Sequence, residues 1–494
     1  MKLVVTHTYS FFPVEGLTAK QLRLADTLLS FLVKDAFHID AVKRHLWDGR
    51  KHLLKKIRKN RQVIGYKFPT GLVRNKKLME ALGNPELVWE NGYGLTKFER
   101  PTDEEVKYLL EDITLRDYQI YAVQKMLKRR RGVIQAAVAS GKTEIAAAVI
   151  KYLNVPTVVM VPKLEILHQT RTRYAKRLGI SKDEIGIIGE SKYVPKRITV
   201  ASVDSLRSMI TRNGGYVDDE ARRFYEEAKL VIFDEAHMVS DNTFFAVFMG
   251  FTKAEFRFGM SATPFDREDD TEIMLIGASS NRIVNITPDY LMKRGFIAIP
   301  DITMLKVGTP KLSPAYNYQT VVQEGIVDNP IRNDAIVQLV KQHKKRKILV
   351  MFRYIRHGRA LSRLLYDQGI DHKIIQGDVE GEDREIIREE FENGSLNIIL
   401  ASVGATGLGT DLPGIEVLIR GDGGKAKIST IQILGRALRI SEGKSHALVY
   451  DFYDDTHRYL RRHSKKRRED YKNIGDLVKV NQIDLSTGQG FLVL

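Results

Sequence analysis

Residues 132 to 150 of the chain read GVIQAAVASGKTEIAAAVI, and this stretch decides the fold of what surrounds it. It opens with a short apolar run typical of a buried strand, passes through a turn of small residues and continues as a helical pattern. A strand, a small-residue loop and a helix in this order hold phosphate oxygens on backbone N–H groups at the helix N-terminus. We therefore expect a nucleotide site at the end of a parallel strand. The alternative is a chance helix start that is rich in small residues.

The loop supplies specific candidates for holding ATP and magnesium. Lys142 is expected to reach the β and γ phosphates, and the Thr143 hydroxyl to ligate Mg²⁺. Ala139 occupies a position where many such loops have glycine, so the loop must form with a Cβ present. The candidate nucleotide-binding residues of the loop are Ala139, Ser140, Gly141, Lys142 and Thr143.

A second motif, LVIFDEAH (residues 230 to 237), places two carboxylates directly after a buried strand. A buried charge is unfavourable without a partner or a metal ion. Two adjacent carboxylates at this position therefore indicate a functional role. In phosphoryl transfer, Asp234 would hold Mg²⁺, and Glu235 would orient and deprotonate the attacking water. A purely structural strand end is the alternative, and it weakens because a phosphate loop lies upstream.

Outward from these motifs, the chain repeats a parallel α/β pattern twice. Short β-branched runs alternate with helical patterns, and each run ends in small or polar residues, as in sheets that bind ligands at the carboxyl ends of their strands. Residues 266–335, between the two repeats, look more irregular and are expected to be a connector plus the entry to the second unit. The first five runs lie at residues 132–138, 156–162, 197–202, 229–235 and 256–263, and the second five at 346–352, 372–378, 397–402, 416–421 and 446–452.

The composition describes a multidomain protein without thiol chemistry. A chain of 494 residues with 43% hydrophobic residues can bury several cores. Because it has no cysteine, disulfides and thiolate zinc sites are excluded, and any metal is expected to be a hard cation on oxygen ligands. No secretory pattern opens the chain, and no run approaches the roughly 18 apolar residues of a membrane span. We therefore expect a cytoplasmic protein that does not associate with membranes.

The net charge of +17 is unevenly distributed, since residues 1–100 carry 19 Lys and Arg against 9 Asp and Glu. A polyanion is the natural partner of such a surface, although a solvated basic face would give the same composition. Within it, KRHLWDGRKHLLKKIRKNR (residues 43 to 61) surrounds Trp47 with cations. Trp47 is expected to be a packing anchor rather than a base-stacking plate. The cations that we expect to contact DNA are Arg50, Lys51, Lys55 and Lys56.

The ordered motifs between residues 115 and 440 resemble those of superfamily 2 helicases and translocases. This resemblance implies an α/β fold class, with two tandem RecA-like parallel-sheet domains that use ATP and Mg²⁺, preceded by a small basic α+β domain. The motifs are LRDYQ (115 to 119), ASGKT (139 to 143), VPKLEILHQT (161 to 170), ASVDSL (201 to 206), DEAH (234 to 237), MSATP (260 to 264), ATGLGTD (405 to 411) and QILGRALR (432 to 439).

The resemblance also implies roles for individual residues. Tyr118 and Gln119 would meet the adenine, and Asp411 the ribose. Arg436 and Arg439 would reach the γ-phosphate from the second domain, because a planar guanidinium suits charge that is spread over phosphoryl oxygens. The implied catalytic set is Lys142, Asp234, Glu235, Arg436 and Arg439.

Other positions would couple ATP to nucleic acid. His237 and Gln432 resemble a coupling pair, and Ser261 and Thr263 of MSATP would link the nucleotide state to the nucleic-acid groove. Contacts to the sugar-phosphate backbone carry no base information, which suits a motor that moves along any sequence. The candidates for such contacts are Pro162, Lys163, Ser202, Gly377 and Thr406.

The N-terminal HLWDGRKHLL (45 to 54) and FPTGL (68 to 72) resemble UvsW-type bacteriophage helicases, and the motor also resembles the group that includes XPB. That resemblance implies an ATP-dependent DNA helicase that remodels branched DNA, by fork regression and Holliday-junction branch migration, in recombination, replication and repair. An RNA helicase and the motor subunit of a restriction-type complex have the same pair of RecA-like ATPase domains and stay open as alternatives. The expected location is the cytoplasm, that of the host cell if the protein is of phage origin. The sequence leaves the oligomeric state open and favours a monomer.

Four domains are expected from these patterns. Residues 1–110 would form the basic DNA-binding domain, 111–285 the first RecA-like domain, 286–460 the second, and 461–494 a basic C-terminal extension. No motif assigns a role to the extension.

Overall fold

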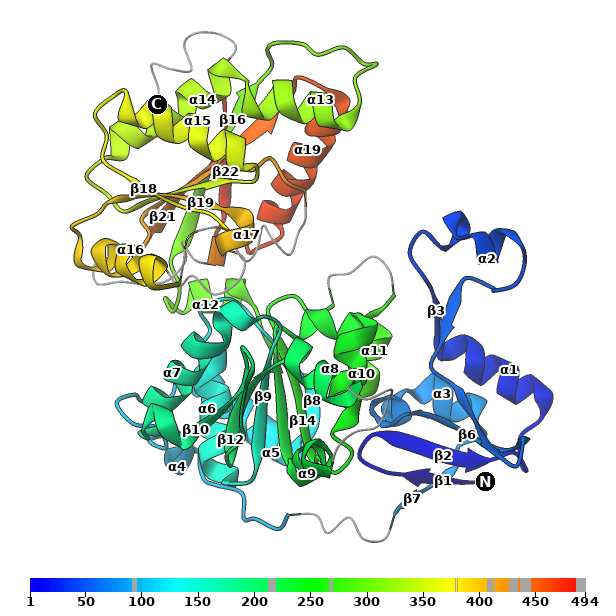
Figure 1. Ribbon diagram of the computed structural model, residues 1–494. Helices are drawn as coiled ribbons and strands as arrows, with labels where there is room; N and C mark the ends of the chain where they lie inside the picture. Colours follow the sequence, from blue (N-terminus) through cyan, green and yellow to red (C-terminus); the bar gives the residue numbers. More distant parts are fainter. Residues whose placement is uncertain are drawn as a thin grey trace. The chain divides into compact units, whose positions relative to one another are not determined.

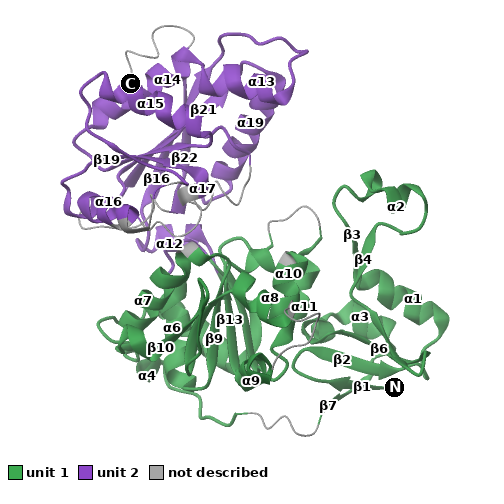
Figure 2. Cartoon of the chain, viewed as in Figure 1, with its two compact units in different colours: residues 1–136, 141–285 green, residues 137–140, 286–494 purple. Residues whose placement is uncertain are grey.

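A computed structural model describes the chain apart from residues 91–95, 212–218, 266–269, 378, 380, 407–411, 413, 426–433, 436–445 and 486–494. The chain divides into two compact units (Figure 2). Unit 1 comprises residues 1–136 and 141–285, and unit 2 comprises residues 137–140 and 286–494.

Unit 1 begins with a small module built on a five-stranded sheet of order β5-β6-β2-β1-β7 (Figure 1). Its strands bury alternate residues, such as Leu3 and Val5 of β1, because one face of the sheet is covered. A separate two-stranded sheet, β3–β4, carries α2 between its strands. The elements are β1 (Lys2–Val5), β2 (Tyr9–Pro13), α1 (Ala19–Leu28), β3 (Ser30–Leu32), η1 (Ala36–His38), α2 (Asp40–Lys43), β4 (Arg50–His52), β5 (Lys55–Lys59), β6 (Gln62–Pro69), η2 (Thr70–Arg74), α3 (Lys76–Ala81) and β7 (Glu86–Trp89).

The rest of unit 1 is an eight-stranded sheet of order β11-β10-β12-β9-β13-β14-β8-β15. The strands from β12 to β8 in this order pair in parallel, and β9 is buried along its whole length, as expected for a sheet covered on both faces. The elements are α4 (Asp103–Lys107), α5 (Asp117–Arg129), β8 (Arg131–Ala136), α6 (Lys142–Leu153), β9 (Thr157–Val161), η3 (Leu164–Ile166), α7 (Leu167–Leu178), η4 (Lys182–Glu184), β10 (Ile185–Gly189), β11 (Lys192–Val194), β12 (Ile198–Ser202), α8 (Val203–Thr211), α9 (Asp219–Glu227), β13 (Leu230–Asp234), η6 (Ala236–Ser240), α10 (Asn242–Gly250), β14 (Phe256–Ser261), α11 (Glu272–Ala278) and β15 (Arg282–Ile286).

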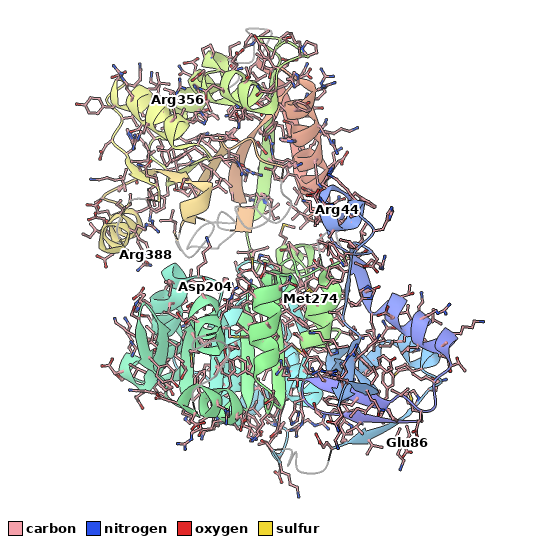
Figure 3. All side chains as sticks on the ribbon, turned by 45° about the vertical axis from the view of Figure 1, so that its right-hand side comes forward. Arg44, Glu86, Asp204, Met274, Arg356 and Arg388 are labelled. Carbon is pink, nitrogen blue, oxygen red and sulfur yellow. The ribbon has the colours of Figure 1, made fainter. Side chains whose placement is uncertain are left out.

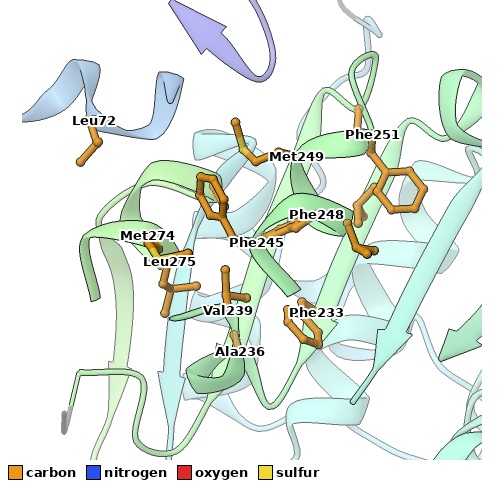
Figure 4. Close-up of a cluster of buried hydrophobic side chains, with 14 of the residues drawn as sticks. Leu72, Phe233, Ala236, Val239, Phe245, Phe248, Met249, Phe251, Met274 and Leu275 are labelled. Atoms are coloured by element: carbon orange, nitrogen blue, oxygen red, sulfur yellow. The ribbon is translucent and has the colours of Figure 1, made fainter. Parts of the chain in front are cut away.

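The module and the larger sheet of unit 1 share one hydrophobic core. Leu72 of η2 belongs to the same cluster of buried side chains as Phe245 of α10 and Leu275 of α11 (Figure 4). A Cβ at Gly71 would lie 1.9 Å from the Ile276 carbonyl oxygen, so only glycine lets η2 approach α11 this closely. The module is therefore packed directly onto the sheet that carries the nucleotide loop.

Unit 2 is a seven-stranded sheet of order β18-β19-β17-β20-β21-β16-β22, in which every pairing is parallel. Two buried clusters, one containing Leu349 and the other Val350, cover its two faces. The elements are α12 (Pro288–Lys293), β16 (Ile299–Val307), α13 (Tyr318–Val322), the π-helical turn η7 (Gln323–Val327), α14 (Pro330–His343), β17 (Ile348–Phe352), α15 (Ile355–Tyr366), β18 (Lys373–Ile375), α16 (Gly381–Asn393), β19 (Ile398–Ser402), α17 (Val403–Thr406), β20 (Val417–Arg420), β21 (His446–Asp454), α19 (Arg458–Lys472) and β22 (Lys479–Asp484).

The expected fold class is confirmed, since each of the ten predicted runs contains a strand of one of the two mainly parallel sheets. Residues 266–335, expected to be a connector plus the entry to the second unit, contain β16, which pairs with β21 over nine residues in the sheet of unit 2. The separate extension expected from residue 461 is wrong. That boundary falls inside α19, and β22 extends the sheet beside β16. In the described part of the chain, no helix is both long and apolar enough to cross a membrane.

Candidate functional site

Three parallel strands of unit 1 bring three sequence motifs to one edge of the sheet. Strand β14 lies between β13 and β8, with Asp234 of β13 opposite Met260 and Gln135 of β8 opposite Ser261. The phosphate loop after β8, the MSATP motif at the end of β14 and the DEAH motif at the end of β13 therefore meet at the carboxyl ends of the strands. This is the edge at which parallel α/β sheets bind ligands.

The phosphate loop links β8 to α6 as the sequence predicts. Gly141 is the N-cap of α6 with φ of 81°, and Lys142 is the first helical residue. Ala139 has φ of 65°, so the alanine is held in a left-handed conformation that costs roughly 1–2 kcal/mol. The Lys142 ammonium donates to the Ala136 carbonyl at 3.4 Å, which folds the side chain back across the loop. Thr143 follows on the first turn of the same helix.

Gln119, the candidate adenine contact, packs against this loop. Its Oε1 accepts a hydrogen bond from the Arg116 backbone N–H at 2.9 Å, and the residue is 6% exposed. A Cβ added to Gly141 would lie 2.2 Å from the Gln119 Nε2. Glycine is therefore favoured at position 141, because a Cβ would add the strain of a positive φ and would displace the Gln119 amide. Tyr118 is buried beside Gln119 on α5.

Asp234 lies at the end of β13 in an environment that disfavours its charge. Burial and the adjacent Glu235 carboxylate raise the pKa of Asp234, and the Lys142 ammonium opposes that rise. Asp234 Oδ1 accepts the Glu235 N–H at 3.0 Å, and Glu235 has a left-handed φ of 55°. Such a strained position is typical of sites where a side chain must be aimed.

The donor set suits magnesium better than a transition metal. Within the described ranges, no group of three or more His, Cys, Asp and Glu is arranged to hold a metal ion. A hydroxyl from Thr143 and a carboxylate from Asp234 are hard oxygen donors, which fit Mg²⁺ whose remaining ligands are phosphate oxygens and water. The residues present therefore fit the magnesium expected with ATP.

His237 connects the DEAH and MSATP motifs. Its Nδ1 lies 3.2 Å from the Ser261 Oγ and 3.2 Å from the Glu235 Oε2. The Ser261 Oγ also accepts the Thr263 N–H at 3.2 Å, so Glu235, His237, Ser261 and Thr263 form a continuous polar chain. His237 is 8% exposed and Ser261 is fully buried. A change at Glu235 can therefore reach Thr263 through direct contacts.

A second layer around the site was not predicted from the sequence. Burial and, to a smaller extent, the Asp234 carboxylate raise the pKa of Tyr174, a buried residue of α7. Arg177, on the same helix α7, donates from Nε to Glu144 Oε1 at 2.8 Å. Glu144 lies two residues after Lys142 on α6. The only signal in the sequence is the helical spacing of these two polar side chains, which a solvated helix face would also show.

The candidate backbone-contact residues also follow neighbouring strands. Pro162 and Lys163 come after β9, and Ser202 ends β12, where it pairs with Val161. Ser202 Oγ accepts the Ser205 N–H at 3.2 Å, so this hydroxyl caps α8, whereas Lys163 is exposed. In unit 2, Gly377 and Thr406 come after the adjacent strands β18 and β19.

Several predicted residues lie outside the part of the chain that the structure describes. They are Asp411, Gln432, Arg436 and Arg439, and the Thr406 side chain is likewise not described. Their expected roles stay predictions.

The basic stretch 43–61 divides into two groups of cations. Arg50 donates from Nε to Ser30 Oγ and from Nη2 to the Ser30 carbonyl, both at 3.0 Å, and holds β4 against β3. Lys51 donates to Asn242 Oδ1, lies 5.7 Å from the centre of the Phe245 ring and has its Nζ 3.4 Å from the Met274 Sδ. Met274 is labelled in Figure 3. Arg50 and Lys51 thus have partners within the protein, and their contact with DNA stays a prediction.

Lys55 and Lys56, by contrast, are exposed on the edge strand β5. Their contact with DNA stays a prediction. Trp47 is half-buried, and its indole N–H donates to the Arg50 carbonyl at 2.9 Å. This bond closes the turn through Asp48 and Gly49, which agrees with a packing role for Trp47.

Two family models match the chain. One, described as Type III restriction enzyme, res subunit, covers residues 112–266, and the other, Helicase conserved C-terminal domain, covers residues 331–441. Together these ranges contain all eight motifs between LRDYQ and QILGRALR.

Individual relatives are distant but extend over most of the chain. The putative DNA 3′-5′ helicase Rad25 of Haloarcula marismortui is 26% identical over 339 residues, 66% of this chain and 51% of that protein, so the match spans about half of its length. The ATP-dependent DNA helicase uvsW of Enterobacteria phage T4 is 24% identical over 357 residues, 68% of each protein. The solved structure of S. cerevisiae Dbp5 bound to RNA and ADP BeF3 shares the fold, with a TM-score of 0.55 and 14% identity over 81% of this chain and 97% of that one.

The substitution Gly141→Ala is expected to weaken ATP binding by about tenfold or more, because a Cβ would displace the Gln119 amide or the loop. The control is Ala139→Gly in the same loop, which removes a Cβ from a left-handed position and should keep binding intact. Equilibrium titration with a fluorescent ATP analogue measures both. Equal affinities for the two variants would contradict the described packing.

Proposed function

Because the chain belongs to superfamily 2 of the helicases and translocases, we propose that it is an ATP-dependent DNA helicase that unwinds and remodels branched DNA. The observation that carries the proposal is the meeting of the phosphate loop, DEAH and MSATP at one sheet edge, joined by the His237–Ser261 contact of 3.2 Å. Such an arrangement suits a site that hydrolyses ATP and passes its state to a second ligand.

In the proposed reaction, Lys142 and the loop N–H groups hold the β and γ phosphates. When bound, Mg²⁺ would neutralise charge on the transferring phosphoryl group, with Thr143 and Asp234 among its ligands. Glu235 orients the attacking water and takes its proton. Arg436 and Arg439, from the second RecA-like domain, are assigned to the charge that develops on the phosphoryl oxygens, so that hydrolysis requires both domains.

Coupling to the nucleic acid is assigned to His237. Its Nδ1 lies at the same distance, 3.2 Å, from the Glu235 carboxylate and the Ser261 hydroxyl. When Glu235 engages water, its contact with His237 changes, and the change can pass to Ser261 and Thr263. Gln432 is assigned to meet His237 when the domains act together.

The preference for branched DNA is supported by exposed cations at two separate places on the chain. Lys55 and Lys56 project from the N-terminal module, while Lys163 follows β9 on the motor sheet. A protein that holds DNA at two places can engage two arms of a fork or junction at once. The resemblance of the module to UvsW-type helicases points the same way.

The engine can be tested with Lys142→Ala. Hydrolysis of ATP should fall by about a hundredfold or more, because the phosphate contact is lost, while DNA binding stays within about twofold of the wild type. The assay compares ATP turnover with forked DNA, four-way junctions, single-stranded DNA and RNA. Stimulation of the wild type by RNA alone would contradict the proposal and favour an RNA helicase.

The module can be tested with the double substitution Lys55→Ala and Lys56→Ala. Fork binding should weaken, and the slope of log affinity against log salt should fall by about 2, since each phosphate contact contributes about 0.9. Lys76→Ala with Lys77→Ala, an exposed pair on α3, is the matched control and should leave the slope unchanged. A slope equal to that of the wild type in the β5 variant would remove Lys55 and Lys56 from the interface.

A further inference from the structure

Helix α19 of unit 2 has a strongly cationic outer face. It carries eight Lys and Arg among its 15 residues and two acids, Glu469 and Asp470. Leu460, His463, Ser464, Arg467 and Tyr471 recur every three or four residues and are buried against the sheet. Four exposed cations share the opposite face at helical spacing, namely Arg458, Arg462, Lys465 and Lys472.

The buried face of α19 fixes the helix rigidly. Arg467 is fully buried and donates to Asp451 Oδ2 at 2.8 Å, to the Gly424 carbonyl at 2.8 Å and to the Phe452 carbonyl at 2.7 Å. The Tyr471 hydroxyl donates to the same Asp451 carboxylate at 2.6 Å. A buried guanidinium is tolerated only with such complete pairing, so the network specifies one orientation of the helix. The outer cations are therefore presented from a fixed element.

The cations of the outer face are only partly balanced, because of the two acids of α19 Glu469 is exposed and Asp470 is buried. Arg458 and Arg462 are four residues apart, as are Arg468 and Lys472, and each such like-charged pair costs a helix stability. Arg461 pairs with Asp455. In the described part of the chain, Arg462, Lys465 and Lys472 have no carboxylate within ion-pair distance. A row of phosphates would supply the missing negative charge.

Aromatic rings lie next to the cations. Tyr318 of α13 meets Tyr459 of α19 edge-on, with ring centroids 6.1 Å apart, and Tyr318 keeps 46% of its surface exposed. The Arg458 guanidinium lies 5.1 Å from the centre of the Tyr459 ring. Figure 1 shows α13 and α19 side by side in unit 2. Exposed rings beside cations are the combination that binds unpaired bases along a strand.

This surface is separate from the motor contacts assigned above. Helix α19 packs on β21 and β22, whereas Gly377 and Thr406 follow β18 and β19 at the other end of the sheet order. We propose that the outer face of α19, with Tyr318 beside it, binds the backbone and bases of single-stranded DNA. The inference rests on the proposed function, because this surface would be an additional binding site for the strand that a DNA helicase unwinds.

The test uses the full-length chain and a fluorescent oligodeoxythymidine, with binding followed by anisotropy over a series of NaCl concentrations. The triple variant Arg458→Gln, Arg462→Gln, Lys465→Gln should bind more weakly, and its salt slope should fall by about 2, since each contact to a single strand contributes about 0.7. The matched control, Lys344→Gln, Lys345→Gln, Arg346→Gln, removes the same charge from exposed positions after α14 and should keep the wild-type slope. Thermal melting verifies that both variants are folded.

A second variant separates stacking from charge. Tyr318→Ala should weaken binding by about tenfold without changing the salt slope, because a ring contact releases no counterions. Wild-type affinity and slope in the triple variant, or a loss confined to duplex DNA, would overturn the inference while the proposed function stands. Failure of the wild-type chain to bind any DNA would instead overturn the proposed function itself.

Discussion

The parallel register of β8, β14 and β13 is the constraint on which the site depends. Each strand ends in a motif that does not by itself indicate a nucleotide site. These motifs are a loop of small residues after β8, a turn with serine and threonine after β14 and a pair of acids after β13. Because β14 is paired with both neighbours, Ser261 lies between the end of β8 and the end of β13. A shift of one residue would turn Asp234 to the other face of the sheet and away from the phosphate loop.

Strand β8 also ties the N-terminal module to the nucleotide loop. At its start, Arg131 donates to the His7 carbonyl of the module and to the Ser279 carbonyl after α11, and at its end Ala136 leads into the loop. Arg131 and the neighbouring Arg257 are buried and bound mainly to backbone carbonyls at helix ends. Burial lowers the pKa of Arg131 to about 9. In unit 2, by contrast, buried arginines are paired with carboxylates, as Arg332 is with Asp454.

The sequence predicted those parts of the fold that rest on local pattern. All ten strand predictions succeeded because strands covered on both faces are short, continuous apolar runs. Strand β16 was missed because IPDITMLKV alternates polar and apolar residues and carries an early proline. The motifs located the nucleotide loop, but the contact of Gln119 with Gly141 and the chain through His237 depend on which strands are neighbours, which local pattern does not show.

Charge was the least predictable property. Arg50 and Lys55 belong to one basic run, yet Arg50 is bound to Ser30 while Lys55 is exposed. The same applies in α19, where Arg467 is fully buried and Lys465 is exposed. Whether a cation faces solvent depends on the packing of its element, so composition gave the kind of partner but not the residues that meet it.

Glu235 is assigned as the base for ATP hydrolysis at this sheet edge. Glu235→Gln keeps the size of the side chain and removes its basicity. Single-turnover ATP hydrolysis by this variant, in the presence of forked DNA, tests the assignment of Glu235. ATP affinity should stay close to that of the wild type, and the hydrolysis rate should fall by about a hundredfold or more. A rate within about threefold of the wild type would contradict the assignment of the site.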